Sequence, residues 1–319
     1  MKREEVLQRL GYSVPDIKKK RVIIHSDICA EADDHFAIVH HLLTPTEDVR
    51  GIIAANYEWR FRTIPSLREQ QGKSMMASYE EGKKLLNLME IDDIPLYKGA
   101  VDQIESLDNL PVSEGADFII EEAMRDDDTP LYIALLGTLT DLAIAYLKEP
   151  KIAKKITAAI WIGGSAYPTG GRESNMQQDI IASKLIFDCP ITLWQVPTTA
   201  YANMYISFAE LITKVKPHGE IGKYLVERMF EINDWYGQVP RRLDFPHGEV
   251  WSIGDQPTVS VLLESELGSK FHIEKVRLCD DMTYTPNPEG KEIRVYDSID
   301  KRLTMEDFFA KLKICYGTN

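Results

Sequence analysis

The stretch RVIIHSDICAEADDHFA, residues 21–37, decides the fold. Its apolar beginning is typical of a buried strand, and its end leads into a helical pattern. Four carboxylates stand between the two, those of Asp27, Glu31, Asp33 and Asp34. In an open parallel α/β sheet, ligands bind at the carboxyl ends of the strands. The stretch therefore predicts acidic groups at a ligand-binding edge.

This acidic cluster has two interpretations. Carboxylates so close in sequence repel one another at neutral pH, and a bound hard cation is the usual way to keep several of them ionised. Alternatively, Asp33 or Asp34 caps the helix while the other acids are solvated, because aspartate is favoured at helix N-termini. The stretch alone leaves both interpretations open.

Length and composition restrict the possible partners. The chain of 319 residues fits a single α/β domain, with residues 1–20 as a peripheral lead-in. A net charge of −13 opposes binding to nucleic acid or to anionic membranes, which favours a small molecule or a cation as partner. The 4 cysteines form no CxxC pair, and we find neither a signal peptide nor a long apolar span. These features predict a reduced, cytoplasmic protein.

The rest of the chain repeats a unit of strand, small-residue turn and helix. Such units predict an open, mostly parallel sheet flanked by helices. We expect a long helix within 65–88 and an amphipathic helix at 207–236 that is broken near Pro217. Asn56 and Trp59 follow a strand and are expected at the ligand edge. Strands are predicted at 49–55, 94–100, 131–136, 158–162 and 191–196, and short strands followed by a helix at 305–314 are predicted in the tail.

Oxygen ligands gather at several other strand ends and loops. They are the turn after Leu136, Glu173 with Asn175, and Asp255. Calcium accepts carboxylates and carbonyls in irregular geometry, whereas zinc prefers cysteine or histidine, and magnesium usually keeps its waters and relies on substrate phosphates. Each residue alone also has a structural explanation, as a helix cap, a turn former or a surface charge. The combination favours a calcium site.

From residue 21 onward, the order of these motifs resembles the inosine-uridine-preferring nucleoside hydrolase family. That family opens with Asp-x-Asp-Pro-Gly-x-Asp-Asp after its first strand, and SDICAEADD is a variant of it. The other resemblances are LLGTLTDLAIAYLKEP to the family's Thr-Gly-Gly-Leu-Thr-Asn turn and helix, IWIGGSAY to its glycine-rich strand end, ESNMQQD to its Glu-Phe-Asn-x-x-x-Asp element and SIGDQPTVSVLL to its late helix start.

The resemblance implies a calcium-dependent hydrolase of the N-glycosidic bond of ribonucleosides or related N-ribosides. Metal-activated water would attack the anomeric carbon in an oxocarbenium-like transition state. The implied metal ligands are Asp27, Asp34, the Leu136 carbonyl and Asp255. The expected substrate-binding residues are Glu31, Asp33, Asn56, Trp59, Glu173, Asn175 and Asp255, the expected catalytic residues are Asp27 and His247, and further candidates beside the leaving base are Tyr57, Tyr201 and Arg241.

Two departures from the family pattern affect the expected chemistry. Aligned without a gap, Cys29 falls where the family places the aspartate that binds calcium and activates water, and cysteine is a poor ligand for a hard cation. Either Asp27 replaces it through a longer loop, or Glu31 turns inward. Gly254 stands where many members carry a histidine associated with the leaving base. The leaving group must then be protonated from elsewhere, with His247 as a candidate, or need little help.

These departures support an alternative function, a non-catalytic calcium-dependent binder of nucleosides or sugars. The retained acids argue against it, because buried carboxylates are costly without a metal. A third hypothesis keeps the enzyme but assigns it another N-riboside or glycoside as substrate. Members of the family are often dimers or tetramers, so a homo-oligomer is compatible with the resemblance, although no patch in the sequence identifies an interface.

Overall fold

The computed structural model describes residues 1–319 except 64, 239–247, 264–267 and 318–319. Its centre is an eight-stranded sheet in the order β3-β2-β1-β4-β5-β6-β12-β9, in which only β9 runs antiparallel to its neighbour. This confirms the predicted open, mostly parallel sheet. The strands are β1 Lys20–Ser26, β2 Glu47–Ala54, β3 Leu96–Lys98, β4 Leu131–Leu135, β5 Ile156–Ile162, β6 Leu193–Val196, β12 Ile293–Ser298 and β9 Lys270–Glu274.

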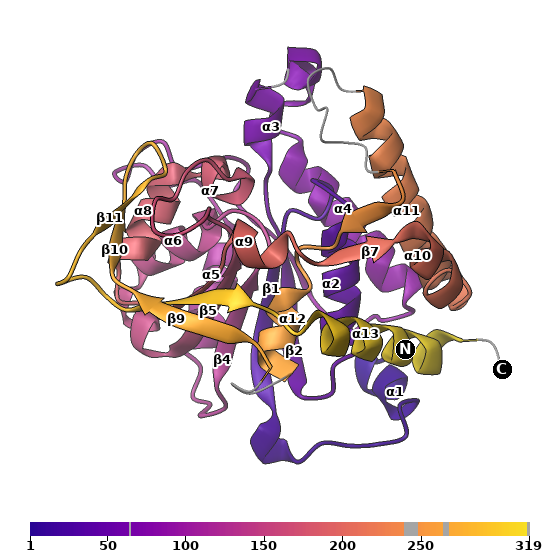
Figure 1. Ribbon diagram of the computed structural model, residues 1–319. Coiled ribbons are helices and arrows are strands. Elements are labelled where there is room, and N and C mark those ends of the chain that lie inside the picture. The colour runs from indigo at the N-terminus through magenta and orange to yellow at the C-terminus, as the bar shows by residue number, and fades with distance from the viewer. Residues whose placement is uncertain (64, 239–247, 264–267, 318–319) are drawn as a thin grey trace.

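Helices cover both faces of the sheet (Figure 1). The α-helices are α1 Arg3–Gln8, α2 Asp33–Leu42, α3 Glu58–Thr63, α4 Ser74–Leu88, α5 Glu114–Ala123, α6 Thr140–Lys148, α7 Ser174–Gln178, α8 Ile180–Asp188, α9 Thr198–Tyr201, α10 Phe208–Lys214, α11 Gly219–Gln238, α12 Pro257–Leu263 and α13 Lys301–Tyr316. Two small antiparallel pairs join β7 Tyr205–Ser207 with β8 Val250–Ser252, and β10 Val276–Leu278 with β11 Tyr284–Pro286. Within the described part of the chain, none of these helices is long and apolar enough to cross a membrane.

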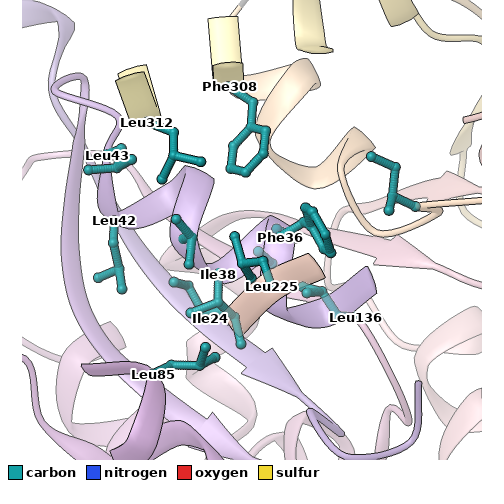
Figure 2. Close-up of a cluster of buried hydrophobic side chains, with 14 of the residues drawn as sticks. Ile24, Phe36, Ile38, Leu42, Leu43, Leu85, Leu136, Leu225, Phe308 and Leu312 are labelled. Atoms are coloured by element: carbon teal, nitrogen blue, oxygen red, sulfur yellow. The ribbon is translucent and has the colours of Figure 1, made fainter. Parts of the chain in front are cut away.

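Alternation along β1 divides the hydrophobic core between the two faces. Val22 and Ile24 pack with α2, α11 and α13, whereas Ile23 joins a second cluster that contains residues of α5, α6 and α8. Figure 2 shows the first cluster, where Phe36 of α2 lies near Phe308 of α13. Each such buried side chain contributes about 1.5–3 kcal/mol of transfer free energy, so β1 is held firmly from both sides.

The strand order places a crevice at the carboxyl end of β1. The chain leaves β1 for β2 on one side, and β4 later pairs with the other side of β1. Such a reversal opens a ligand crevice at the carboxyl ends of the two strands concerned. The residues that follow Ser26 and Leu135 therefore face each other across this crevice.

Two segments differ from their predictions. The helix expected within 65–88 is interrupted: a 3₁₀ turn covers Pro65–Gln70, and Gly72 then takes the left-handed conformation, which favours glycine, before α4 begins. The N-terminal helix is anchored to the core rather than only peripheral, because the buried guanidinium of Arg3 donates hydrogen bonds to the carbonyls of Leu42 and Glu47. By contrast, the predicted break near Pro217 is confirmed by the separation of α10 from α11.

Candidate active site

Three aspartates from two elements meet at the carboxyl end of the sheet. Asp33 and Asp34 form the first turn of α2, and Asp255 precedes α12. One carboxylate oxygen of each lies within 4.8 Å of the others. The helix-cap interpretation is not observed for α2, because its N-cap is Ala32 and no side chain caps it. Their place in the first helical turn still stabilises Asp33 and Asp34 through the helix dipole.

Burial disfavours the ionised form of these acids. It raises the pKa values of Asp33, Asp34 and Asp255 well above the ordinary range, and repulsion between neighbouring carboxylates raises them further. A bound divalent cation would offset both effects. The cluster offers only hard oxygen ligands, which suits calcium or magnesium and not zinc. The residues present therefore fit a hard divalent metal ion.

Asp27 lies beside this cluster, whereas Cys29 does not. Asp27 lines the same cavity, and burial raises its pKa to about 7. The turn after β4 packs closely against it, since a Cβ added at Gly137 would lie 2.4 Å from the Asp27 Oδ1. The thiol of Cys29 instead points to the Ala77 carbonyl at 3.5 Å. The loop after β1 thus turns the cysteine away and leaves Asp27 facing the cavity.

The acids border a cavity of about 350 Å³, which falls within the size range of small-molecule sites. The predicted site residues that line it are Asp27, Glu31, Asp33, Asp34, Leu136, Asn175, Tyr201 and Asp255. Other described lining residues are Ala30, Arg60, Ile162, Ser174, Gln178, Thr198, Ala202, Tyr205, Trp251, Ser252 and Gly254. His247 and Arg241 lie outside the described residues, so their predicted roles stay predictions.

Glu173 supports the cavity wall from behind and does not line it. Its carboxylate caps α7, accepting hydrogen bonds from the backbone amides of Asn175 at 3.0 Å and Met176 at 2.9 Å. It also accepts one from the hydroxyl of Tyr201 at 3.0 Å. Asn175 does line the cavity, and its amide nitrogen donates to the Leu136 carbonyl at 2.9 Å. The predicted sugar-binding pair therefore occupies two different positions.

Three other predicted residues also lie behind the wall. Asn56 is buried and donates a hydrogen bond to the Ala100 carbonyl at 3.1 Å. Trp59 lies on α3, with the guanidinium of Arg172 over its ring at 5.1 Å. Tyr57 is buried and packs edge-on against Phe61. In this structure these side chains shape the surroundings of the cavity and do not form its surface.

Two features of the wall follow from contacts between distant segments. A Cβ added at Gly254 would lie 2.9 Å from Cδ2 of Tyr201, so the absence of a side chain there makes room for the tyrosine ring. Arg60 and Gln178 line the cavity although they were not predicted to do so. Arg60 belongs to a run of polar and aromatic residues that follows β2. The run predicted that these residues lie at the ligand-binding edge of the sheet, but it did not predict which of their side chains point into the cavity.

Comparison with known proteins finds the same fold in solved structures. The chain resembles, in fold, a plant nucleoside hydrolase with a TM-score of 0.70 and 19% identity over 92% of this chain and 98% of the other. It also resembles a purine-preferring ribonucleoside hydrolase from Gardnerella vaginalis, with a TM-score of 0.72 and 15% identity over 93% and 99% of the two chains. Identities this low show a shared fold.

Sequence comparison extends the likeness. A probable uridine nucleosidase 2 from Oryza sativa subsp. japonica is 20% identical over 132 residues, which span 40% of this chain and 39% of that relative. The family model described as inosine-uridine preferring nucleoside hydrolase matches residues 72–306, well over half of the chain. The chain therefore belongs to the inosine-uridine preferring nucleoside hydrolase family.

Proposed function

We propose that this protein is a calcium-dependent enzyme that hydrolyses the N-glycosidic bond of ribonucleosides. Its family acts on N-glycosidic bonds of nucleosides, which makes the chain an N-glycosidic bond hydrolase. The observation that carries the calcium requirement is the cluster formed by the buried Asp34 and Asp255 with the half-buried Asp33. Such a group would be costly to bury without a cation.

The metal would be held by carboxylates at the carboxyl end of the sheet. Its predicted ligands are Asp27, Asp34, the Leu136 carbonyl and Asp255, all of which line the same cavity. Asp33 is a further candidate, because its carboxylate clusters with those of Asp34 and Asp255. When bound, a divalent cation makes water a stronger nucleophile near neutral pH.

Asp27 would act as the general base. It follows β1 directly, so its position is set by a rigid strand, and its pKa of about 7 lies near the working pH of a general base. A cation nearby would lower that pKa and keep the carboxylate able to accept a proton. We therefore assign Asp27, and not Cys29, to the abstraction of the proton from attacking water.

The sugar would be held by the oxygen and amide groups around the acids. Carboxylates of Asp33 and Asp255 can accept hydrogen bonds from ribose hydroxyls, and Asn175 can both donate and accept them. All three line the cavity. Fixing the sugar in this way orients its anomeric carbon toward the attacking water.

Cytoplasmic location and a homo-oligomeric state remain predictions from the sequence.

The test is release of reducing sugar from purified protein with a panel of purine and pyrimidine ribonucleosides. We expect turnover with added calcium and its loss after chelation. Calcium bound without turnover on any nucleoside would contradict the proposal and favour a binding protein. Turnover that survives complete chelation would refute the metal requirement.

A variant tests the assignment of the ligands. Asp255→Ala should lower calcium affinity measured by titration calorimetry, because it removes one of the three clustered carboxylates. The matched control is Asp128→Ala, which removes an exposed acid that does not line the cavity. Unchanged calcium affinity in the Asp255 variant would contradict the assigned site.

A further inference from the structure

Arg60 brings a positive charge to the acidic cavity. It belongs to α3, and its side chain is 11% exposed. The guanidinium donates a hydrogen bond to the Ala30 carbonyl, and its second terminal nitrogen lies 3.6 Å from a carboxylate oxygen of Glu31. The same carboxylate accepts a hydrogen bond from Tyr236 of α11 at 2.9 Å. Arg60 is thus fixed between the loop after β1 and α11.

The surroundings of Arg60 keep it charged. Burial works to lower its pKa, but the combined effect of Tyr236, Glu31, Asp27 and Tyr57 outweighs burial and raises that pKa above its ordinary value. The guanidinium carbon also lies 5.6 Å from the centre of the Tyr236 ring and 5.8 Å from that of Trp235. Aromatic faces attract cations at such distances. Arg60 is therefore a permanent cation with a preset orientation.

The charges on the cavity wall are of two kinds. The described lining contains the acids Asp27, Glu31, Asp33, Asp34 and Asp255, and among the described lining residues Arg60 is the only one with a cationic side chain. Carboxylates can hold sugar hydroxyls and stabilise an oxocarbenium-like sugar. They cannot stabilise negative charge on a departing base, which a guanidinium can.

Hydrolysis of a neutral nucleoside creates such a charge. The bond from the anomeric carbon to the base nitrogen breaks, and its electron pair goes to the base. The water oxygen bonds to the anomeric carbon, and the water proton passes to Asp27. The base then carries a negative charge until it takes a proton from solvent. Gly254 on the cavity wall has no side chain to donate a proton.

We infer that Arg60 stabilises the departing base as an anion when a neutral ribonucleoside is hydrolysed. This inference rests on the proposed function. A guanidinium does not give up its proton near neutral pH, so it acts by charge and hydrogen bonding, not as a general acid. Base carbonyl oxygens supply acceptors that share the developing charge with the ring nitrogen.

The test compares Arg60→Gln with Arg62→Gln on two kinds of substrate. Arg62 lies on the same helix, pairs with Asp102 and does not line the cavity, so it is a matched control. Uridine and inosine need help to release their bases, whereas p-nitrophenyl β-D-ribofuranoside releases a weakly basic anion and needs little. Circular dichroism and thermal unfolding verify that each variant folds.

We expect Arg60→Gln to lower kcat on uridine and inosine by roughly a hundredfold to a thousandfold, the usual effect of losing one charge-stabilising donor. On the p-nitrophenyl riboside we expect only a few-fold loss, and Arg62→Gln should match the wild type on all three.

Equal losses on all three substrates would overturn the inference, because they would mean that Arg60 acts only by holding the loop at Ala30. No loss on uridine or inosine would overturn it as well. A wild-type protein that hydrolyses none of the three would instead refute the proposed function, and the inference with it.

Discussion

Ionisation of Asp27 should make the metal-free protein less stable as the pH rises, and Asp27→Asn should remove that dependence. The side chain is 3% exposed, and burial raises its pKa from 3.8 to about 7 in the folded protein. Between these values the unfolded chain has lost the proton that the folded protein still holds. The stability that the protonated form supplies is therefore complete below pH 3.8 and is lost as the pH rises toward 7.

The size of the effect follows from the same two values. Each pH unit between the folded and unfolded pKa values corresponds to about 1.4 kcal/mol, so ionised Asp27 lowers the free energy of unfolding by about 4 kcal/mol. Asparagine has nearly the same shape and no charge to bury. In chelator, Asp27→Asn should resemble the wild type near pH 4 and exceed its stability by roughly 4 kcal/mol near pH 8.

Urea unfolding followed by tryptophan fluorescence would measure the difference across this pH range. Asp128→Asn is the control, because it makes the same substitution at an exposed carboxylate that is outside the cavity. Parallel pH profiles for wild type and Asp27→Asn would refute the reasoning. Saturating calcium should shrink the gap, since a cation pairs with the ionised carboxylate, while hydrolytic activity of the variant is lost with the base.

Three further outcomes are expected. Gly137→Ala should lower kcat about a hundredfold, because the added Cβ would lie 2.4 Å from the Asp27 carboxylate. Gly248→Ala is the control, because an added Cβ there meets no atom within 4 Å. Equal kcat values for the two variants would contradict the packing argument. Gly254→His should lower the free energy of unfolding by roughly 1–3 kcal/mol through overlap with Tyr201, and Tyr201→Ala in the same chain should recover part of it in urea titrations. Calcium at about a hundred times its Kd should stabilise the protein by about 3 kcal/mol in thermal scans, and no shift would exclude tight binding.

The sheet could be predicted from sequence because its signals are local. Apolar runs followed by turns identify β1, β4 and β5 without knowledge of which strands they pair with. The acids after β1 lie at the predicted ligand-binding edge of the sheet. The cavity wall was less predictable. Whether Glu173 faces a sugar or caps α7 depends on how the chain turns after β5, and its pattern is the same in both cases. Similarly, the position of Arg60 on the cavity wall depends on contacts with Ala30, Glu31 and Tyr236, the last of which is far away in sequence.

The position of Cys29 outside the cavity shows which local features determine where the site residues lie. A motif aligned by spacing puts Cys29 in the place of the base, but position in space is set by secondary structure. Asp27 is fixed by the end of β1, and Asp33 and Asp34 are fixed by the beginning of α2. The loop between them can change its path without moving either end, because both elements are held by the core. Counting from element boundaries, and not from motif spacing, therefore identifies Asp27 as the residue that faces the cavity.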